Sequence, residues 1–257
     1  MSLTDTQGQA DRRQVALQRV GVKGVEIPFQ IKAMADGHQT VLATVTLTAD
    51  LPHHHKGTHM SRFIEVFEAH RRDLSMPRFL DMLADVRTSL EAETAYADLH
   101  FPYFIEKRAP VSGQSSMMSY DCAYMGKVWN VGHEFDVSVA VPVQTVCPCS
   151  KAISAYGAHN QRGIVTLTVA LGPFFWIEDL VALVEGSASS GVYTLLKRED
   201  EKFVTERAFD NPRFVEDLVR QVSQEVEALG KFPRFSVEAE NFESIHNHSA
   251  YAFVQRG

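Results

Sequence analysis

The stretch that decides the fold is VSVAVPVQTVCPCSK, residues 137–151. Valine occupies every second position from Val137 to Val143, a period of two that is typical of a β-strand with one buried face. The strand leads into Cys147-Pro148-Cys149, and a second strand pattern, residues 164–169, follows after His159 and Arg162. Two of the three cysteines therefore stand at the end of a strand, and we expect the chemistry there.

The spacing of Cys147 and Cys149 limits what the two thiols can do. Pro148 favours an extended backbone at Cys147, and a Cys-x-Cys pair is a poorer chelate than a Cys-x-x-Cys knuckle. We expect one thiol to face the site and the other not. A disulfide is not expected, because three cysteines without an export signal are typical of a reducing, intracellular compartment. The alternative is that both cysteines are small hydrophobic residues buried beside a strand.

Composition and charge narrow the class of protein. With 257 residues, 45% of them hydrophobic and 22% charged, the chain is typical of a globular protein of one or two domains. A net charge of −7 gives no general attraction for nucleic acid, so an anionic ligand needs locally gathered cations. The N-terminus lacks the apolar region of an export signal, and no apolar run is long enough to span a membrane. We therefore expect a cytoplasmic protein with no nucleic-acid and no membrane partner.

The first half of the chain predicts the order strand, strand, helix, helix, strand. The strands are expected at residues 20–27, 39–49 and 96–104, the last one broken at Pro102. Apolar stripes that begin at Met60 and Pro77 predict the two helices. Before the first helix lies HHHKGTHMSR, residues 53–62, which is either a solvated loop or a cationic loop that receives phosphates.

The second half gives a similar order. After the strands at 115–126, 137–146 and 164–169, the pattern predicts a helix over 176–186, a strand over 192–196 and a solvated turn over the charged run 197–202, which contains Glu201. Asn211-Pro212 starts the last helix, with Glu216 off its apolar stripe. His246 and His248 are expected to share one face of a final strand, with Glu243 on the loop before them.

The repeated layout predicts an α+β fold of two tandem modules, each an antiparallel sheet with helices on one face. We expect a flexible N-terminal tail at residues 1–18, a first module at 19–114, and a second module at 115–257 that carries most of the active site. No linker rich in proline, glycine or serine separates the halves, so we expect them to share a sheet or an interface.

The candidate site residues form a mixed set of sulfur, nitrogen and oxygen donors. Zinc accepts thiolate, imidazole and carboxylate ligands, and a metal-bound water becomes a nucleophile near neutral pH. The chain has no HExxH motif, no P-loop and no Rossmann fingerprint. The pattern therefore favours hydrolysis or addition to an electrophilic carbon over phosphoryl or hydride transfer.

Six motifs in order closely resemble the prokaryotic type IB GTP cyclohydrolase I family. They are KGTHMSRF at residues 56–63, CPCS at 147–150, HNQRG at 159–163, LLKR with DEK at 195–202, NP with FVED at 211–217, and NFESIHNH at 241–248. The resemblance implies the tunnelling fold, with two such modules per subunit assembled into a toroidal homotetramer. It also implies conversion of GTP and water to 7,8-dihydroneopterin triphosphate and formate, the first step towards tetrahydrofolate.

The resemblance implies a role for each candidate residue. Cys147 is implied as the metal thiolate for Zn²⁺, Mn²⁺ or Fe²⁺, with further ligands drawn from His159, Glu201 and His246. Glu216 is implied as the guanine anchor, because a carboxylate accepts from both N1–H and the exocyclic amine. Water is expected to add at C8 of the purine, formate to leave, the ribose to isomerise and a new ring to close. The candidates for the proton transfers are Glu243, His246 and His248, and those for the triphosphate are Lys56, His59, Arg62, Lys151 and Arg162.

Two alternatives belong to other classes of protein. One is a tunnelling-fold nitrile reductase, in which a cysteine attacks covalently and NADPH supplies hydride. The other is a non-catalytic thiol and histidine protein that holds metal but releases no formate. The sequence leaves open the physiological metal, the resting ligand set among His159, Glu201, Glu243 and His246, and which basic residues reach the triphosphate across subunit interfaces.

Overall fold

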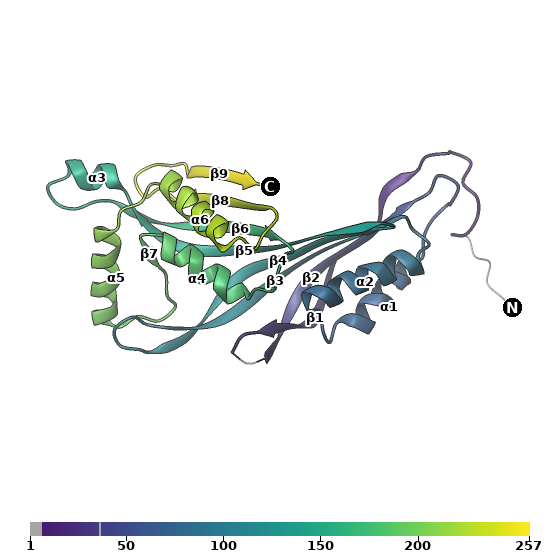
Figure 1. The fold of residues 1–257 in the computed structure, drawn as a ribbon, viewed down its shortest axis with the longest axis horizontal. Helices are drawn as coiled ribbons and strands as arrows, with labels where there is room; N and C mark the ends of the chain where they lie inside the picture. Colours follow the sequence, from purple (N-terminus) through teal and green to yellow (C-terminus); the bar gives the residue numbers. More distant parts are fainter. Residues whose placement is uncertain (1–6, 36) are drawn as a thin grey trace. The chain divides into compact units, whose positions relative to one another are not determined.

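The computed structural model describes residues 7–35 and 37–257 (Figure 1). The chain forms two compact units: the first comprises Met1–Phe101 and Ala123–Asp136, and the second comprises Pro102–Cys122 and Val137–Gly257. Three long strands contribute residues to both units, namely β3 (Thr94–Arg108), β4 (Ser115–Trp129) and β5 (Gly132–Val146).

The first unit is a sheet with the strand order β1-β2-β3-β4-β5 and two helices. Its other elements are β1 (Leu17–Ala33), β2 (Gly37–Leu51), α1 (Met60–His70) and α2 (Met76–Ser89). Strands β1 and β2 are antiparallel, and β2 buries every second side chain. Helix α2 packs closely on β4, since a Cβ on Gly126 would lie 2.4 Å from Cε1 of Phe79. Only glycine lets the helix approach the strand so closely.

The second unit has the strand order β3-β4-β5-β6-β8-β9, with the short β7 paired to β5. Strand β6 pairs antiparallel with β8, and β8 with β9. The apolar stripes of α4 and α6 are buried together with the inward faces of β6 and β8. Its other elements are α3 (Pro148–Ile153), β6 (Asn160–Ala170), α4 (Ile177–Ser187), β7 (Ser190–Gly191), α5 (Arg198–Asp210), α6 (Val215–Leu229), β8 (Phe235–Asn241) and β9 (Ala250–Arg256).

Antiparallel strand pairs and helices that bury one face match the predicted α+β class, but five local predictions are wrong. Asn211 is the C-cap of α5 and does not start the last helix, which begins at Val215. Strand β3 runs unbroken through Pro102, and residues 192–197 form no strand. The charged run belongs largely to the first turn of α5 and is not a turn between elements. His246 and His248 lie in the loop between β8 and β9. The predicted modules divide the chain at one point in the sequence, whereas the compact units are defined by packing and each combines separate segments. The module boundary therefore stays a prediction.

Part of the predicted N-terminal tail, residues 1–6, lies outside the described residues. The rest of that segment contacts the loop before α1: the Asp11 N–H donates to His54 O, and the N–H of Lys56 and of Gly57 donate to Gln9 O and Gln7 O. Within the described ranges, no helix has the length and hydropathy needed to cross a membrane.

Candidate active site

Cys147, in the second unit, directly follows the last residue of β5 and is the N-cap of α3. Its backbone is extended, with φ −70° and ψ 118°, as the following proline predicts, and its Sγ accepts a hydrogen bond from the Ser150 N–H at 3.4 Å. Cys147 is half-buried and Cys149 is exposed. The two thiols differ because α3 begins between them. Strand alternation is not the reason, since residues i and i+2 of a strand share a face.

His159 lies beside Cys147 because the loop after α3 folds back on the end of β5. The Cys147 N–H donates to His159 O at 3.1 Å, and the His159 N–H donates to Ser150 Oγ at 3.1 Å. The short α3 thus serves to return the chain to the point where β5 ended.

A hydrogen-bonded chain fixes the ring of His159. Gln161 Nε2 donates to Thr145 Oγ1 at 2.8 Å, and Gln161 Oε1 lies 3.0 Å from Nδ1 of His159. An amide oxygen only accepts, so the neutral tautomer that fits this contact carries its proton on Nδ1 and its lone pair on Nε2. Gln161 and Thr145 are both buried, and the sequence reasoning missed both of them.

Glu243 brings a carboxylate to the same end of the sheet. Its Oε2 lies 3.8 Å from Nδ1 of His159, and the two side chains are only 13% and 15% exposed. The Phe242 N–H donates to Arg162 O at 2.9 Å. This bond extends the pairing of β8 with β6 to the residue just before Glu243. Asn241, which ends β8, is buried, and a Cβ on Gly163 would lie 2.4 Å from its Oδ1. The glycine of the HNQRG motif therefore leaves room for the side chain that precedes the Glu243 loop.

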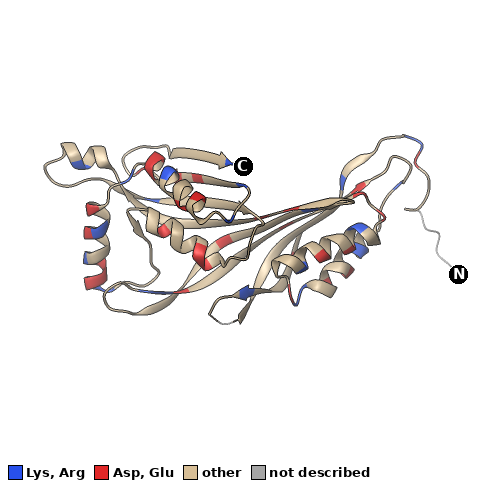
Figure 2. Cartoon of the chain, viewed as in Figure 1, with Lys and Arg blue, Asp and Glu red and all other residues tan. Residues whose placement is uncertain are grey.

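The other predicted ligands and acids lie elsewhere in the second unit. Glu201 is exposed in the first turn of α5, a helix that carries both acidic and basic residues (Figure 2). His246 and His248 are exposed, with their rings stacked at 5.0 Å. Glu216 is exposed in the first turn of α6. No three His, Cys, Asp or Glu side chains among residues 7–35 and 37–257 lie close enough together to hold a metal ion, so the ligand set stays a prediction.

The predicted cations divide between the two units. In the second unit, Lys151 donates to Phe209 O and lies 4.2 Å from the centre of that ring, and Arg162 is exposed on β6. In the first unit, Lys56 donates to Gln9 at 3.2 Å, Arg62 donates to Ser89 O at 2.8 Å, and His59 precedes α1. Neither unit alone brings all five together.

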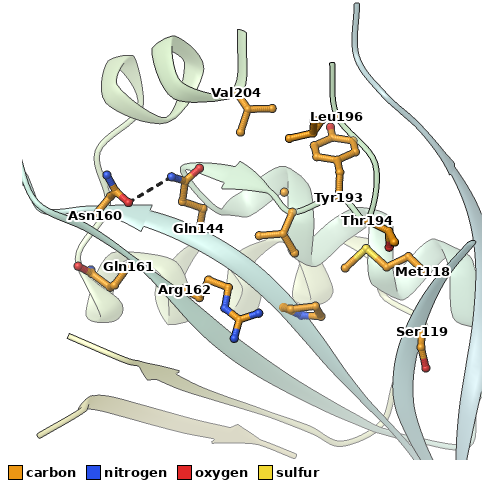
Figure 3. Close-up of a pocket in the computed structure, with 13 residues that line it drawn as sticks. Met118, Ser119, Gln144, Asn160, Gln161, Arg162, Tyr193, Thr194, Leu196 and Val204 are labelled. Atoms are coloured by element: carbon orange, nitrogen blue, oxygen red, sulfur yellow. Dashed lines mark hydrogen bonds between the residues drawn. The ribbon is translucent and has the colours of Figure 1, made fainter. Parts of the chain in front are cut away.

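A cavity of about 520 Å³ opens next to Arg162 in the second unit (Figure 3). The side chains of β5 and β6 that border it include Gln144 and Asn160, which share a hydrogen bond at 3.5 Å. Tyr193 and Thr194, from the segment between β7 and α5, and Met118 from β4 line its other sides. Apart from the arginine, nothing in the sequence indicates this cavity, because its walls come from five separate segments of the chain.

Asp200 is a second buried group that sequence reasoning missed. Its carboxylate accepts from the N–H groups of Val111, Ser112 and Lys197 and from Ser112 Oγ, at 2.6 to 2.9 Å. Burial by itself raises the pKa of Asp200, but these hydrogen bonds outweigh burial and hold the pKa well below its ordinary value. The residue therefore ties the start of α5, with Glu201, to the turn after β3. Its position three residues after Lys197, as in a capping box, was the available signal.

Comparisons with known proteins cover nearly the whole chain. The family model of type I GTP cyclohydrolase folE2 matches residues 3–252. GTP cyclohydrolase FolE2 of Syntrophus aciditrophicus (strain SB) is 52% identical, over 99% of this chain and 100% of that protein. GTP cyclohydrolase FolE2 of Azoarcus sp. (strain BH72) is 50% identical, over 99% of this chain and 95% of that protein. Among solved structures, uricase from Arthrobacter globiformis matches with a TM-score of 0.51 and 7% identity, over 93% of this chain and 92% of that one. This likeness concerns the fold alone, and it confirms the predicted fold class.

Proposed function

The chain belongs to the type I GTP cyclohydrolase folE2 family, and from that premise we propose an active site built around Cys147 at the end of β5. The chain is a GTP cyclohydrolase, which converts GTP and water to 7,8-dihydroneopterin triphosphate and formate on the way to tetrahydrofolate. The observation that best supports this site is that the backbone of Cys147 bonds to that of His159, whose ring lies 3.8 Å from the carboxylate of Glu243. The comparisons give no support to the alternative of a nitrile reductase.

The proposed cofactor is one divalent metal ion, Zn²⁺, Mn²⁺ or Fe²⁺. Cys147, His159, Glu201 and His246 form the proposed ligand set, and their thiolate, imidazole and carboxylate groups are ligands that these ions accept. The hydrogen bond from His159 Nδ1 to Gln161 supports the assignment, because it leaves Nε2 free to bind a metal. When bound, the ion would supply Lewis-acid activation of the water that adds to the purine.

Glu216 is the proposed anchor of the guanine base. Its carboxylate can accept from both N1–H and the exocyclic amine, an edge that adenine does not offer. Helix α6, which carries Glu216, begins next to the cysteine, since the Arg213 N–H donates to Val146 O at 2.9 Å. The base would then extend from the first turn of α6 towards Cys147, with C8 at the reacting end.

Glu243, His246 and His248 are the proposed proton carriers. Adding water across the C8–N7 bond takes a proton from the water and delivers one to the nitrogen, and the later ring opening and closure need further transfers. A carboxylate with little exposure beside an imidazole, as in Glu243 and His159, suits such an exchange. The two stacked histidines are exposed and can exchange protons with solvent.

The proposed triphosphate contacts are Lys56, His59, Arg62, Lys151 and Arg162. Arg162 has the strongest support, because its exposed side chain borders the cavity of the second unit. Cationic side chains suit a ligand of this charge, all the more in a chain whose net charge is −7.

The test is formate release from GTP by protein stripped of metal and then supplied with single divalent ions. We expect no turnover in the stripped protein and recovery with more than one ion, because a site with one thiolate is less soft than a site with two. Full turnover without metal would contradict the proposed cofactor. Consumption of NADPH with a nitrile substrate, and no formate with any ion, would favour the reductase instead.

A homotetramer in the cytoplasm completes the proposal. Strand β9 supports self-association, because it is the last strand of the sheet and carries the exposed side chains of Tyr251 and Phe253. Sedimentation of the metal-loaded protein should give the mass of four chains. A monomer at working concentration would contradict the tetramer without touching the proposed chemistry.

A further inference from the structure

The segment between α5 and α6, residues 211–214, is held by hydrogen bonds to the ends of two elements, α4 and β5. Asn211 Nδ2 donates to Ala188 O at 2.9 Å, and the Arg213 N–H donates to Val146 O at 2.9 Å. Just before the segment, Lys151 from α3 donates to Phe209 O. The backbone of Arg213 is therefore fixed next to the residue that precedes Cys147.

The side chain of Arg213 has a buried donor with no acceptor. Its Nε is inaccessible to solvent and makes no hydrogen bond among the described residues, and no carboxylate of that part of the chain pairs with the guanidinium. A buried N–H without an acceptor is costly, and a charged one is costlier. Such a group, fixed beside an active site, is a candidate for a bond to the substrate.

The position of Arg213 indicates which part of the substrate it meets. Arg213 lies three residues before Glu216, just before the N-cap of α6, and its backbone bonds to the residue before Cys147. Around the edge of a guanine, the order of groups is the exocyclic amine, N1–H, O6, N7 and C8. If Glu216 holds the first two groups and C8 reacts near Cys147, the edge between them presents O6 and N7.

We propose that Arg213 donates hydrogen bonds to O6 and N7 of the guanine, an inference that rests on the proposed function and on Glu216 as the anchor. A guanidinium fork matches these two acceptors, and arginine is the side chain that most often reads them. Adenine has an amine in place of O6, so the fork would meet a donor and reject the base. A hydrogen bond to N7 also draws electrons from the five-membered ring, which makes C8 easier for water to attack.

The test compares base and phosphate contacts separately. Guanosine and inorganic tripolyphosphate are used as competitive inhibitors of GTP turnover by the metal-loaded enzyme. Arg213→Gln should weaken inhibition by guanosine about 5- to 150-fold, the range for one bidentate arginine–guanine pair, and should leave inhibition by tripolyphosphate within about twofold. Loss of tripolyphosphate inhibition with unchanged guanosine inhibition would overturn the proposal and make Arg213 a phosphate ligand.

Three further variants test whether the effect of Arg213→Gln comes from a paired contact with the base or only from the loss of a positive charge. Arg220→Gln removes an exposed arginine of α6, which pairs with Asp217, and should change inhibition by neither compound. Arg213→Lys keeps the charge without the fork and should recover only part of the loss, whereas full recovery would overturn the paired contact. Glu216→Gln should weaken inhibition by guanosine whether or not Arg213 contacts the base. Melting temperatures show whether each variant is folded.

The outcome for Arg213 is distinguishable from that for the proposed function. If the wild-type enzyme releases no formate from GTP, the function itself fails. If it does release formate, and Arg213→Gln binds guanosine like wild type while Glu216→Gln does not, only the assignment of Arg213 fails.

Discussion

The two compact units bury different kinds of side chain. Among residues 7–35 and 37–257, all the buried polar and charged residues belong to the second unit, whereas the first unit buries aromatic and aliphatic groups. The polar set is Thr145, Gln161, Ser187, Ser189, Ser190, Asp200, Ser223 and Asn241. Burying a polar group costs free energy unless it forms a hydrogen bond, so it needs a partner atom at a particular position. A buried apolar group needs only neighbours that fill the space around it. The first unit is therefore built for packing, and the second holds particular atoms in particular directions.

The largest expected effect concerns the two thiols of the second unit. Cys147→Ala should abolish formate release, because it removes the proposed metal thiolate at the point where β5 ends. Cys149→Ala should only weaken activity, since this thiol is exposed on α3. Turnover and metal content are measured together, with the melting temperature as the check on folding. Equal and complete loss in both variants, with metal content and folding unchanged, would contradict the assignment.

The next effect concerns packing in the first unit. Phe79 is fully buried against Phe135, with ring centres 4.8 Å apart, and its ring occupies the position that a side chain at Gly126 would take. Phe79→Ala should lower the free energy of unfolding by about 3–5 kcal/mol, without changing the metal affinity of the molecules that remain folded. Urea unfolding and metal titration test this. Val131→Ala, at a position 91% exposed in the same unit, is the control and should change stability by less than about 0.5 kcal/mol.

Replacing Gln161 should lower stability less than replacing Phe79, and it should also lower the affinity for the metal ion. Gln161→Leu keeps the size of the side chain but frees the His159 ring and leaves Thr145 Oγ1 without its donor. Metal affinity should fall about 10- to 100-fold, as for other residues that orient a histidine ligand. Isothermal titration with the ion, at one pH, measures it. Gln144→Leu is the control, since the amide of Gln144 bonds to Asn160 instead.

A double variant separates orientation from stability at the same place. Thr145→Val with Gln161→Leu removes both partners of the buried bond, so stability should recover relative to Gln161→Leu alone. The metal affinity should stay low, because the His159 ring is still unheld. If affinity returned together with stability, Gln161 would be a structural residue only.

The same contrast explains which features the sequence could predict. Apolar periodicity predicted β2, β5 and the helices α1, α2, α4 and α6, since each depends mainly on burying one face. Pro102 was expected to break β3, but Leu99, Phe101 and Tyr103 continue the buried alternation across it, and this burial outweighs one missing N–H.

Polar structure in the second unit was harder to predict, because its partners are distant in sequence. The predicted strand at 192–196 does not form: Lys107 Nζ donates to Val192 O at 2.7 Å, and Thr194 Oγ1 donates to Met117 O at 3.1 Å. Side-chain donors therefore bond to backbone carbonyls that a strand ladder could otherwise pair. Cys147, His159 and Glu243 were predicted from residue type and motif, but Gln161 and Arg213 were not. The bond of Gln161 to Thr145 and the burial of the Arg213 side chain depend on packing that no local pattern encodes.

The smallest expected effect tests how the helices of the two units begin. In the first unit, the N-cap N–H of α2 donates to Asp73, which lies before the helix, whereas in the second the aspartates Asp179, Asp200 and Asp217, within the first turns of α4, α5 and α6, accept from the N-cap N–H. Asp200 is the buried member of this set.

The pKa of Asp200 is lowered in the folded protein from an ordinary value of 3.8, so its carboxylate stabilises the fold above that pH, and the contribution is lost as the pH falls below it. Asp200→Asn should therefore be less stable than wild type at neutral pH, and the difference should shrink on titration to about pH 3. Urea unfolding at both pH values measures this, with Asp210→Asn, an exposed aspartate at the far end of α5, as the control. A difference that stayed constant with pH would mean that the ionised carboxylate is not what holds the start of α5. In that case the buried side chain at position 200 would stabilise the second unit through its size and hydrogen bonds and not through its negative charge.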